Sequence, residues 1–194
     1  MLAEDYRFKT DAEIVRLSLN NQEYFACLIE RYQTKLANYI RKIANLSAED
    51  IEDVLQDVFI KVYKNLNNFN PELKFSSWIY RITHNEVISN YRKLQARPLV
   101  INLPAEDDNF LNNLASSLET DNQIDRQLLR KNINQVLDKL DVKYREVLVL
   151  KFLEDKDYQE IADILQKPMG TVGTLISRAK IRFKKELAEQ NIKF

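Results

Sequence analysis

Apolar residues in the first half of the chain recur at the spacing of amphipathic helices. Thr10 and Glu13 form a predicted capping box at which a helix begins. Further along, one buried face repeats at i, i+3, i+4 and i+7 through Phe25, Leu28, Ile29, Tyr32 and Leu36. A second helix is predicted to begin at Ser47 and to bury Ile51, Val54, Leu55, Val58 and Val62. A third is predicted from near Phe75 through Tyr91 toward Arg97, with a buried face of Phe75, Trp78, Ile79 and Ile82.

The second half of the chain shows the pattern of a helix-turn-helix. A helix is predicted around Leu128 to Leu140, and another from Tyr144 to Phe152. Two amphipathic helices follow, separated by a helix-breaking segment from Gln166 to Met169. The first is predicted to bury Tyr158, Ile161, Ala162 and Leu165, and the second to bury Val172, Leu175, Ile176, Ala179 and Phe183. Two such helices joined by a connection of about four residues are typical of a helix-turn-helix.

Composition excludes several classes of protein. Two glycines in 194 residues, against a usual share of about 7 %, favour an all-α fold. Gly170 and Gly173 lie three apart, so no glycine-rich phosphate loop exists. Cys27 and His84 are the whole cysteine and histidine inventory, which is too small for a zinc cluster or a disulfide framework. No apolar run approaches the roughly 18 residues of a membrane span. We therefore predict a cytoplasmic protein that is not an enzyme and binds no metal or cofactor.

Charge is unevenly distributed, although 29 basic residues balance 29 acidic ones. Residues 98–124 contain five acidic side chains and no Lys or Arg, a composition that resists burial. We interpret this segment as a flexible acidic linker between two small helical domains, residues 1–97 and 125–194. Within it, Phe110, Leu111, Leu114 and Leu118 keep a helical spacing. Both a short docked helix and a transient one are consistent with that spacing.

Two surfaces of the first domain are candidates for function. The Ser47 helix presents an acidic stripe with one apolar residue, made of Glu49, Asp53, Gln56, Asp57 and Ile60. This stripe suits either a protein partner or plain solvent. The third helix presents cations and an amide beside an aromatic residue that we expect to be exposed, in the set Tyr80, Arg81, His84, Asn85, Arg92 and Lys93. With the preceding Asn-rich loop, which contains Phe69, this set suits a separated nucleic-acid strand. We expect Trp78 to belong to the core.

The second helix of the helix-turn-helix offers a surface suited to duplex DNA. Small, hydroxyl and basic side chains lie opposite its apolar face, at Gly170, Gly173, Thr174, Ser177, Arg178 and Ile181. Lys180, Lys184 and Lys185 flank them. Small residues let a helix approach base edges, and Arg bonds guanine bidentately. The alternative is the solvated face of a helical hairpin.

Five motifs together resemble one family. They are Asp53 to Phe59, Phe75 to Ile82 followed by His84 and Asn85, Tyr144 to Leu148, Tyr158 to Ala162, and Gly170 to Val172. In this order and spacing they resemble the extracytoplasmic-function sigma factors, which are small initiation factors of bacterial RNA polymerase. The resemblance covers roughly residues 11–97 and 125–188.

The resemblance implies a transcription initiation factor that binds core RNA polymerase and promoter DNA. It implies docking on the polymerase clamp helices through Asp53, Gln56, Asp57, Phe59 and Ile60. It implies melting of the minus-ten element by Asn68, Phe69, Tyr80, Arg81, His84, Asn85 and Arg92, with a flipped base held near Asn68, Phe69 and Asn85. It implies recognition of the minus-thirty-five element by Thr171, Gly173, Thr174, Ser177, Arg178 and Lys180. The linker would thread toward the active-site and RNA-exit channels, and an anti-sigma factor would regulate the chain.

This chain departs from the family pattern at two positions. The family usually carries a basic residue where Gly173 stands, and often Arg where Leu175 stands. Two alternative functions come from other classes. One is a free-standing, two-domain helix-turn-helix transcriptional regulator, and the other is an adaptor of helical hairpins that binds no DNA.

Overall fold

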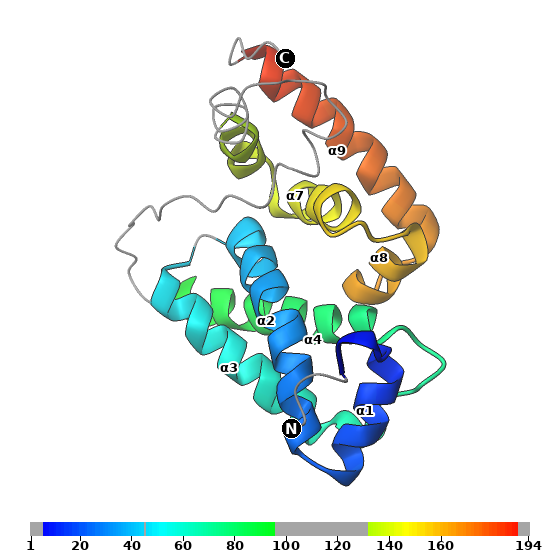
Figure 1. Ribbon diagram of the computed structural model, residues 1–194. Helices are drawn as coiled ribbons and strands as arrows, with labels where there is room; N and C mark the ends of the chain where they lie inside the picture. The colour runs from blue at the N-terminus through cyan, green and yellow to red at the C-terminus, as the bar shows by residue number, and fades with distance from the viewer. Residues whose placement is uncertain (1–5, 45, 96–131, 190–194) are drawn as a thin grey trace, which may run out of the picture. The chain divides into compact units, whose positions relative to one another are not determined.

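The computed structural model describes residues 6–44, 46–95 and 132–189, apart from the side chains of Arg7 and of residues 91–95 (Figure 1). Every regular element in these ranges is helical. The chain divides into two compact units, Met1–Leu103 and Pro104–Phe194. An all-α fold of two helical domains is therefore confirmed, while the exact domain boundaries stay a prediction. The predicted linker, its possible helix at residues 110–118 and the start of the Leu128 helix lie outside the described residues.

The described part of the first unit contains four α-helices and two short 3-10 turns. They are η1 (Tyr6–Phe8), α1 (Asp11–Asn20), α2 (Glu23–Ile43), α3 (Ala48–Lys64), η2 (Leu66–Asn68) and α4 (Phe75–Gln95). The predicted capping box of Thr10 with Glu13 is present, and Ser47 forms a second one with Asp50. Each box satisfies backbone N–H groups that the first turn leaves without a partner. Both helix starts are therefore fixed locally by the sequence.

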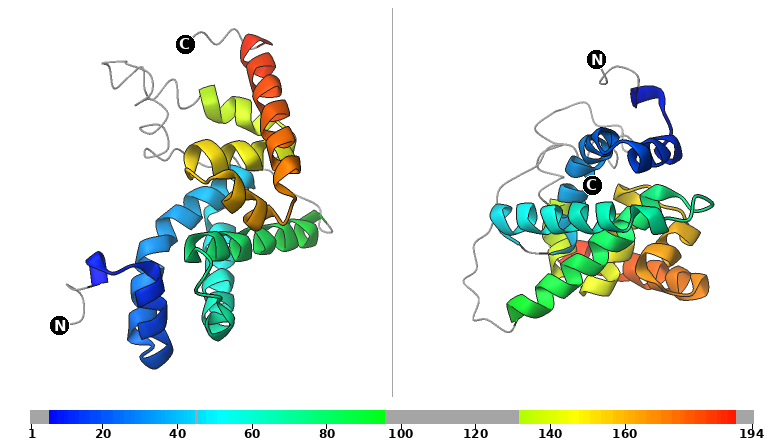
Figure 2. Two further views of the ribbon diagram at one scale, coloured as in Figure 1. Left: turned by 90° about the vertical axis from the view of Figure 1, so that its right-hand side faces the viewer. Right: turned by 90° about the horizontal axis from the view of Figure 1, so that it is seen from below.

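Packing in the first unit centres on α2. This helix lies between α1 and α3, and α4 crosses α3 (Figure 1; Figure 2). Buried aliphatic side chains on the inward faces of these helices fill the space between them, including Leu28, Leu36, Ile40, Val54, Val58, Val62 and Ile79. Ile29, Leu55 and Ile82, predicted on buried faces, are only half-buried. They lie at the edges of those faces.

The second unit ends in the predicted helix-turn-helix. A helix over 132–139 precedes α7 (Val142–Leu148) and a π-helical segment, η3 (Val149–Leu153). The motif itself consists of α8 (Tyr158–Leu165) and α9 (Met169–Glu189). At the end of α8, Gln166 adopts a left-handed backbone with φ of 52°. The chain thereby reverses before Pro168, and α9 packs on both α7 and α8. No helix in the described ranges is long and apolar enough to cross a membrane.

A carboxyl group is buried beneath the helix-turn-helix. Glu146 on α7 is 6 % exposed. Burial raises the pKa of its carboxyl from the ordinary 4.5 to about 7, and the nearby charges of Lys167 and Arg145 oppose this rise. Between these two pH values the folded unit binds a proton that the unfolded chain does not. Protonation of Glu146 therefore stabilises the fold as the pH falls from 7 toward 4.5.

We predict that Glu146→Gln removes this pH dependence. The rise in pKa from 4.5 to about 7 changes the free energy of unfolding by at most about 3 kcal/mol between these two pH values. The neutral amide of glutamine cannot titrate. Hydrogen exchange of the α7 and α9 amides, corrected for intrinsic rates, measures the stability of this unit. Because the single tryptophan is Trp78, its fluorescence reports the first unit as an internal control. A variant that keeps the wild-type pH dependence would contradict the assignment to Glu146.

Candidate functional site

The exposed side of α3 carries the predicted acidic face. Glu49, Asp53, Gln56 and Asp57 are exposed, and Ile60 among them is 50 % exposed. We call these five residues the acidic face. They point outward because Ile51, Val54, Val58 and Val62 bury the opposite side of the helix. Phe59, which was predicted to join this surface, is instead buried at 9 % exposure.

An ion pair joins α3 to α4 behind this face. The Lys61 ammonium contacts the Glu86 carboxylate, whose side chain is almost fully buried, while about half of the Lys61 side chain is exposed. A buried carboxylate without a cation would be costly, so the pair holds the two helices in one relative position. No local pattern predicts this pair, because 25 residues separate the partners.

Phe69, at the start of the loop before α4, belongs to the core rather than to an open pocket. It is 8 % exposed. Its ring centroid lies 5.4 Å from that of Phe75 and 5.3 Å from that of Trp78, and these two lie 5.6 Å apart. We call these three residues the aromatic cluster. The expected core position of Trp78 is confirmed, whereas Asn68, directly before Phe69, is exposed.

One side of α4 presents polar groups, and Tyr80 is not among them. Arg81 and His84 are half-buried and Asn85 is exposed, at the i, i+3, i+4 spacing of one helix face. We call these three residues the α4 polar face. The side chain of Arg92, predicted to belong with them, lies outside the described residues.

The expectation that Tyr80 is exposed was wrong. Tyr80 is 2 % exposed, and its ring centroid lies 5.1 Å from that of Tyr39 on α2. It shares the buried side of α4 with Ile79, Thr83 and Val87. The Tyr39 hydroxyl lies 3.5 Å from Nδ1 of His84, so the buried tyrosine pair supports the α4 polar face from beneath.

The outward side of α9 carries the surface predicted for duplex DNA. Its exposed residues are Thr171, Thr174, Ser177, Arg178 and Lys180, which we call the recognition face. The Thr174 hydroxyl donates to the Gly170 carbonyl, 3.0 Å away. The Lys180 ammonium lies 5.1 Å from the Phe152 ring centroid, which restrains that cation.

Tyr158 adjoins this surface, although the sequence pattern assigned it to a buried face. It is 40 % exposed, and the Lys151 ammonium lies 5.6 Å from its ring centroid. Gly173 is half-buried beside it. A Cβ atom at Gly173 would lie 3.7 Å from Cε1 of Tyr158, an ordinary contact distance. The structure therefore has room for a Cβ atom at position 173.

Comparison with known proteins assigns both units. The sigma-70 region 2 model matches residues 28–97, and the sigma-70 region 4 model matches residues 130–183. The chain is 29 % identical to the ECF RNA polymerase sigma factor SigW of Bacillus subtilis, over 91 % of this chain and 95 % of the relative. It is 31 % identical to the RNA polymerase sigma-H factor of Pseudomonas aeruginosa, over 91 % and 93 %.

Solved structures share the fold. CnrH, in complex with the cytosolic domain of CnrY, matches with a TM-score of 0.68 and 25 % identity. The match covers 93 % of this chain and 99 % of that one. The resemblance therefore extends through both units, not through the helix-turn-helix alone.

We predict that Phe69→Ala destabilises the first unit by about 3 kcal/mol, because it empties a packed site among aromatic rings. Phe8→Ala is the matched control, since the Phe8 ring is 91 % exposed and exposed substitutions change stability by about 0.5 kcal/mol or less. Denaturant unfolding followed by Trp78 fluorescence measures both variants. Equal stability of the two would show that the Phe69 ring is not part of the core.

Proposed function

The chain belongs to the extracytoplasmic-function sigma factors of bacterial RNA polymerase, and we propose how its surfaces divide the work of initiation. As a sigma factor it binds core RNA polymerase and directs it to promoters. The free-standing regulator and the adaptor are not favoured, because the first unit matches sigma-70 region 2 and the second matches region 4. This paired match is the observation that carries the function.

The acidic face docks on core polymerase in this proposal. Its residues need no rearrangement to reach a partner, because all five are exposed on one side of α3. Carboxylates would repel DNA, whereas Ile60 offers apolar area to a protein. Phe59 supports the face from the core rather than contacting the polymerase, since it is buried.

The α4 polar face and Asn68 take the separated minus-ten strand. Arg81 supplies positive charge for phosphates, and the Asn68 and Asn85 amides can pair with the polar edge of an unstacked base. The burial of Phe69 and Tyr80 makes them supports for this surface. This division of roles revises the prediction that both aromatic rings contact DNA.

The recognition face enters the major groove of the minus-thirty-five element. Thr171, Thr174 and Ser177 offer short polar side chains, and Arg178 can bond a guanine or a phosphate. Gly173 supplies no side chain of its own. Contacts at that point of the groove would therefore come from neighbours such as Tyr158, which is half-exposed beside it.

The chemistry of RNA synthesis belongs to the polymerase, and we assign this chain no catalytic step. Its place of action follows from its partner, the polymerase of the cytoplasm. CnrH was solved with the cytosolic domain of CnrY. The sigma factor RpoE of Bartonella quintana, which shares the fold with a TM-score of 0.65, was solved with the anti-sigma factor NepR. By analogy, we propose that an anti-sigma factor holds this chain inactive by covering the surfaces that polymerase and DNA require.

We predict that Asp53→Lys weakens binding to core polymerase by about tenfold or more, because charge reversal places like charges across the interface. Its effect on stability should stay within about 0.5 kcal/mol, since Asp53 is exposed. Glu23→Lys on α2 is the matched control, with the same charge change at another exposed position. Titration of labelled core polymerase measures all three proteins. If Asp53→Lys binds as tightly as Glu23→Lys does, the acidic face is not the docking surface.

We predict that the charge of the recognition face sets promoter affinity. Arg178→Ala should cost about 1 to 3 kcal/mol if the contact is bidentate to guanine. Gly173→Lys should strengthen binding and steepen its salt dependence by about one phosphate contact. Holoenzyme binding to a promoter across a salt series measures both, with Lys139→Ala, an exposed cation outside α9, as control. An Arg178→Ala variant that behaves like Lys139→Ala would remove Arg178 from the DNA interface.

A further inference from the structure

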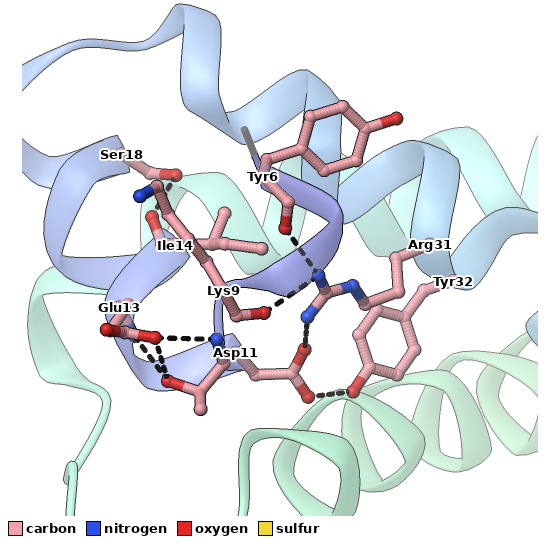
Figure 3. A network of polar contacts seen from close by, with 9 residues as sticks. Tyr6, Lys9, Asp11, Glu13, Ile14, Ser18, Arg31 and Tyr32 are labelled. Carbon is pink, nitrogen blue, oxygen red and sulfur yellow. Dashed lines mark hydrogen bonds and ion pairs between the residues drawn. The ribbon is translucent and has the colours of Figure 1, made fainter. Parts of the chain in front are cut away.

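A polar network ties the N-terminal turn to α2 (Figure 3). Arg31 Nη1 donates to the Asp11 carboxylate at 2.6 Å, and Nη2 donates to the Tyr6 and Lys9 carbonyls, both at 3.0 Å. The Arg31 and Asp11 side chains are 22 % and 26 % exposed, so solvent screens the pair only in part. One guanidinium thus fixes both η1 and the start of α1.

Asp11 also connects this network to the core. Its second carboxylate oxygen accepts a hydrogen bond from the Tyr32 hydroxyl (Figure 3). Tyr32 is 4 % exposed, and its ring meets that of Phe75 edge-on, with centroids 5.6 Å apart and an interplanar angle of 71°. The hydroxyl bond holds one end of a ring whose other side packs on the aromatic cluster.

The aromatic cluster closes the loop before α4 at both ends. Phe69 begins the loop, Phe75 begins α4, and their rings are in contact. Asn68 lies directly before this closure. A change in the tilt of Tyr32 therefore acts on Phe75, and through Phe75 on the position of the loop. Packed cores pass on such changes because they contain few voids.

We propose that Asp11 and Tyr32 are positioning residues for the minus-ten loop, and that α1 thereby takes part in promoter opening. This rests on the proposed function of Asn68 and the α4 polar face. The free-energy cost of extruding a base is offset by contacts that form only after the base has left the stack. Those contacts require donors and acceptors held within a fraction of an ångström. The Asp11–Tyr32 hydrogen bond supplies that restraint from outside the DNA interface.

The test compares transcription from two templates by holoenzyme made with bacterial core polymerase. The promoter is one that the wild-type holoenzyme selects from a randomised library, used as duplex and with a mismatched bubble at the minus-ten element. Tyr32→Phe removes only the hydroxyl group and should slow initiation on duplex about fivefold. A change of that size corresponds to the net stabilisation by one hydrogen bond. On the bubble template its rate should stay within about twofold of wild type, because the cost of base extrusion is already met.

Two further variants separate positioning from stability. Glu13→Gln is the matched control, because the Glu13 carboxylate lies on the same helix but bonds only within the capping box of Thr10. It should initiate like wild type on both templates. Asp11→Ala should show the duplex-specific defect, and adding Tyr32→Phe to it should worsen that defect little, since both act through one bond.

Three results would overturn the proposal. They are a Tyr32→Phe defect of equal size on both templates, a duplex-specific defect of the same size in Glu13→Gln, and full additivity of Asp11→Ala with Tyr32→Phe. Failure of the wild-type chain to support transcription on either template would instead overturn the proposed function, and this proposal with it.

Discussion

The arrangement of the first unit depends on the contact among Phe69, Phe75 and Trp78. These rings close the connection between η2 and α4, and the Tyr32 ring packs against Phe75 from α2. A polar loop has little apolar area with which to hold itself in place, so its two ends must be fixed by the core. The position of Asn68 relative to α4 therefore depends on aromatic packing that does not itself reach the surface.

The interfaces of both units arise from the same constraint. Each helix buries one face, and the opposite face is left to carry chemistry: carboxylates on α3, amide and basic groups on α4, and hydroxyl and basic groups on α9. Within the first unit, an ion pair links two of the helices that carry these faces. Lys61 with Glu86 joins α3, which we propose docks on the polymerase, to α4, which we propose takes the melted strand. Within each unit, the exposed faces therefore lie on helices whose packing is set by the core of that unit.

Local signals in the sequence predicted most of the helix starts and the exposed faces. The Thr10 box, the Ser47 start and the break before Met169 were correct because capping and turn chemistry act within a few residues. Tyr80 was misplaced because periodicity alone does not fix which residues at the margin of a helix face the core. The family resemblance placed Phe69 beside a flipped base, whereas its ring packs in the aromatic cluster. The ion pair of Arg31 with Asp11 joins residues that lie 20 apart in the sequence. No local sequence pattern predicts such a pair.

Site-specific crosslinking tests the central claim, which is that the α4 polar face holds the minus-ten strand while the recognition face holds the minus-thirty-five element. A photoreactive residue would replace Asn85 in one protein and Ser177 in another, both exposed positions. Crosslinked nucleotides would then be mapped in the holoenzyme–promoter complex. We predict that position 85 labels one strand of the minus-ten element and position 177 labels the minus-thirty-five duplex. Labelling of the same element from both positions, or exchanged elements, would contradict the account.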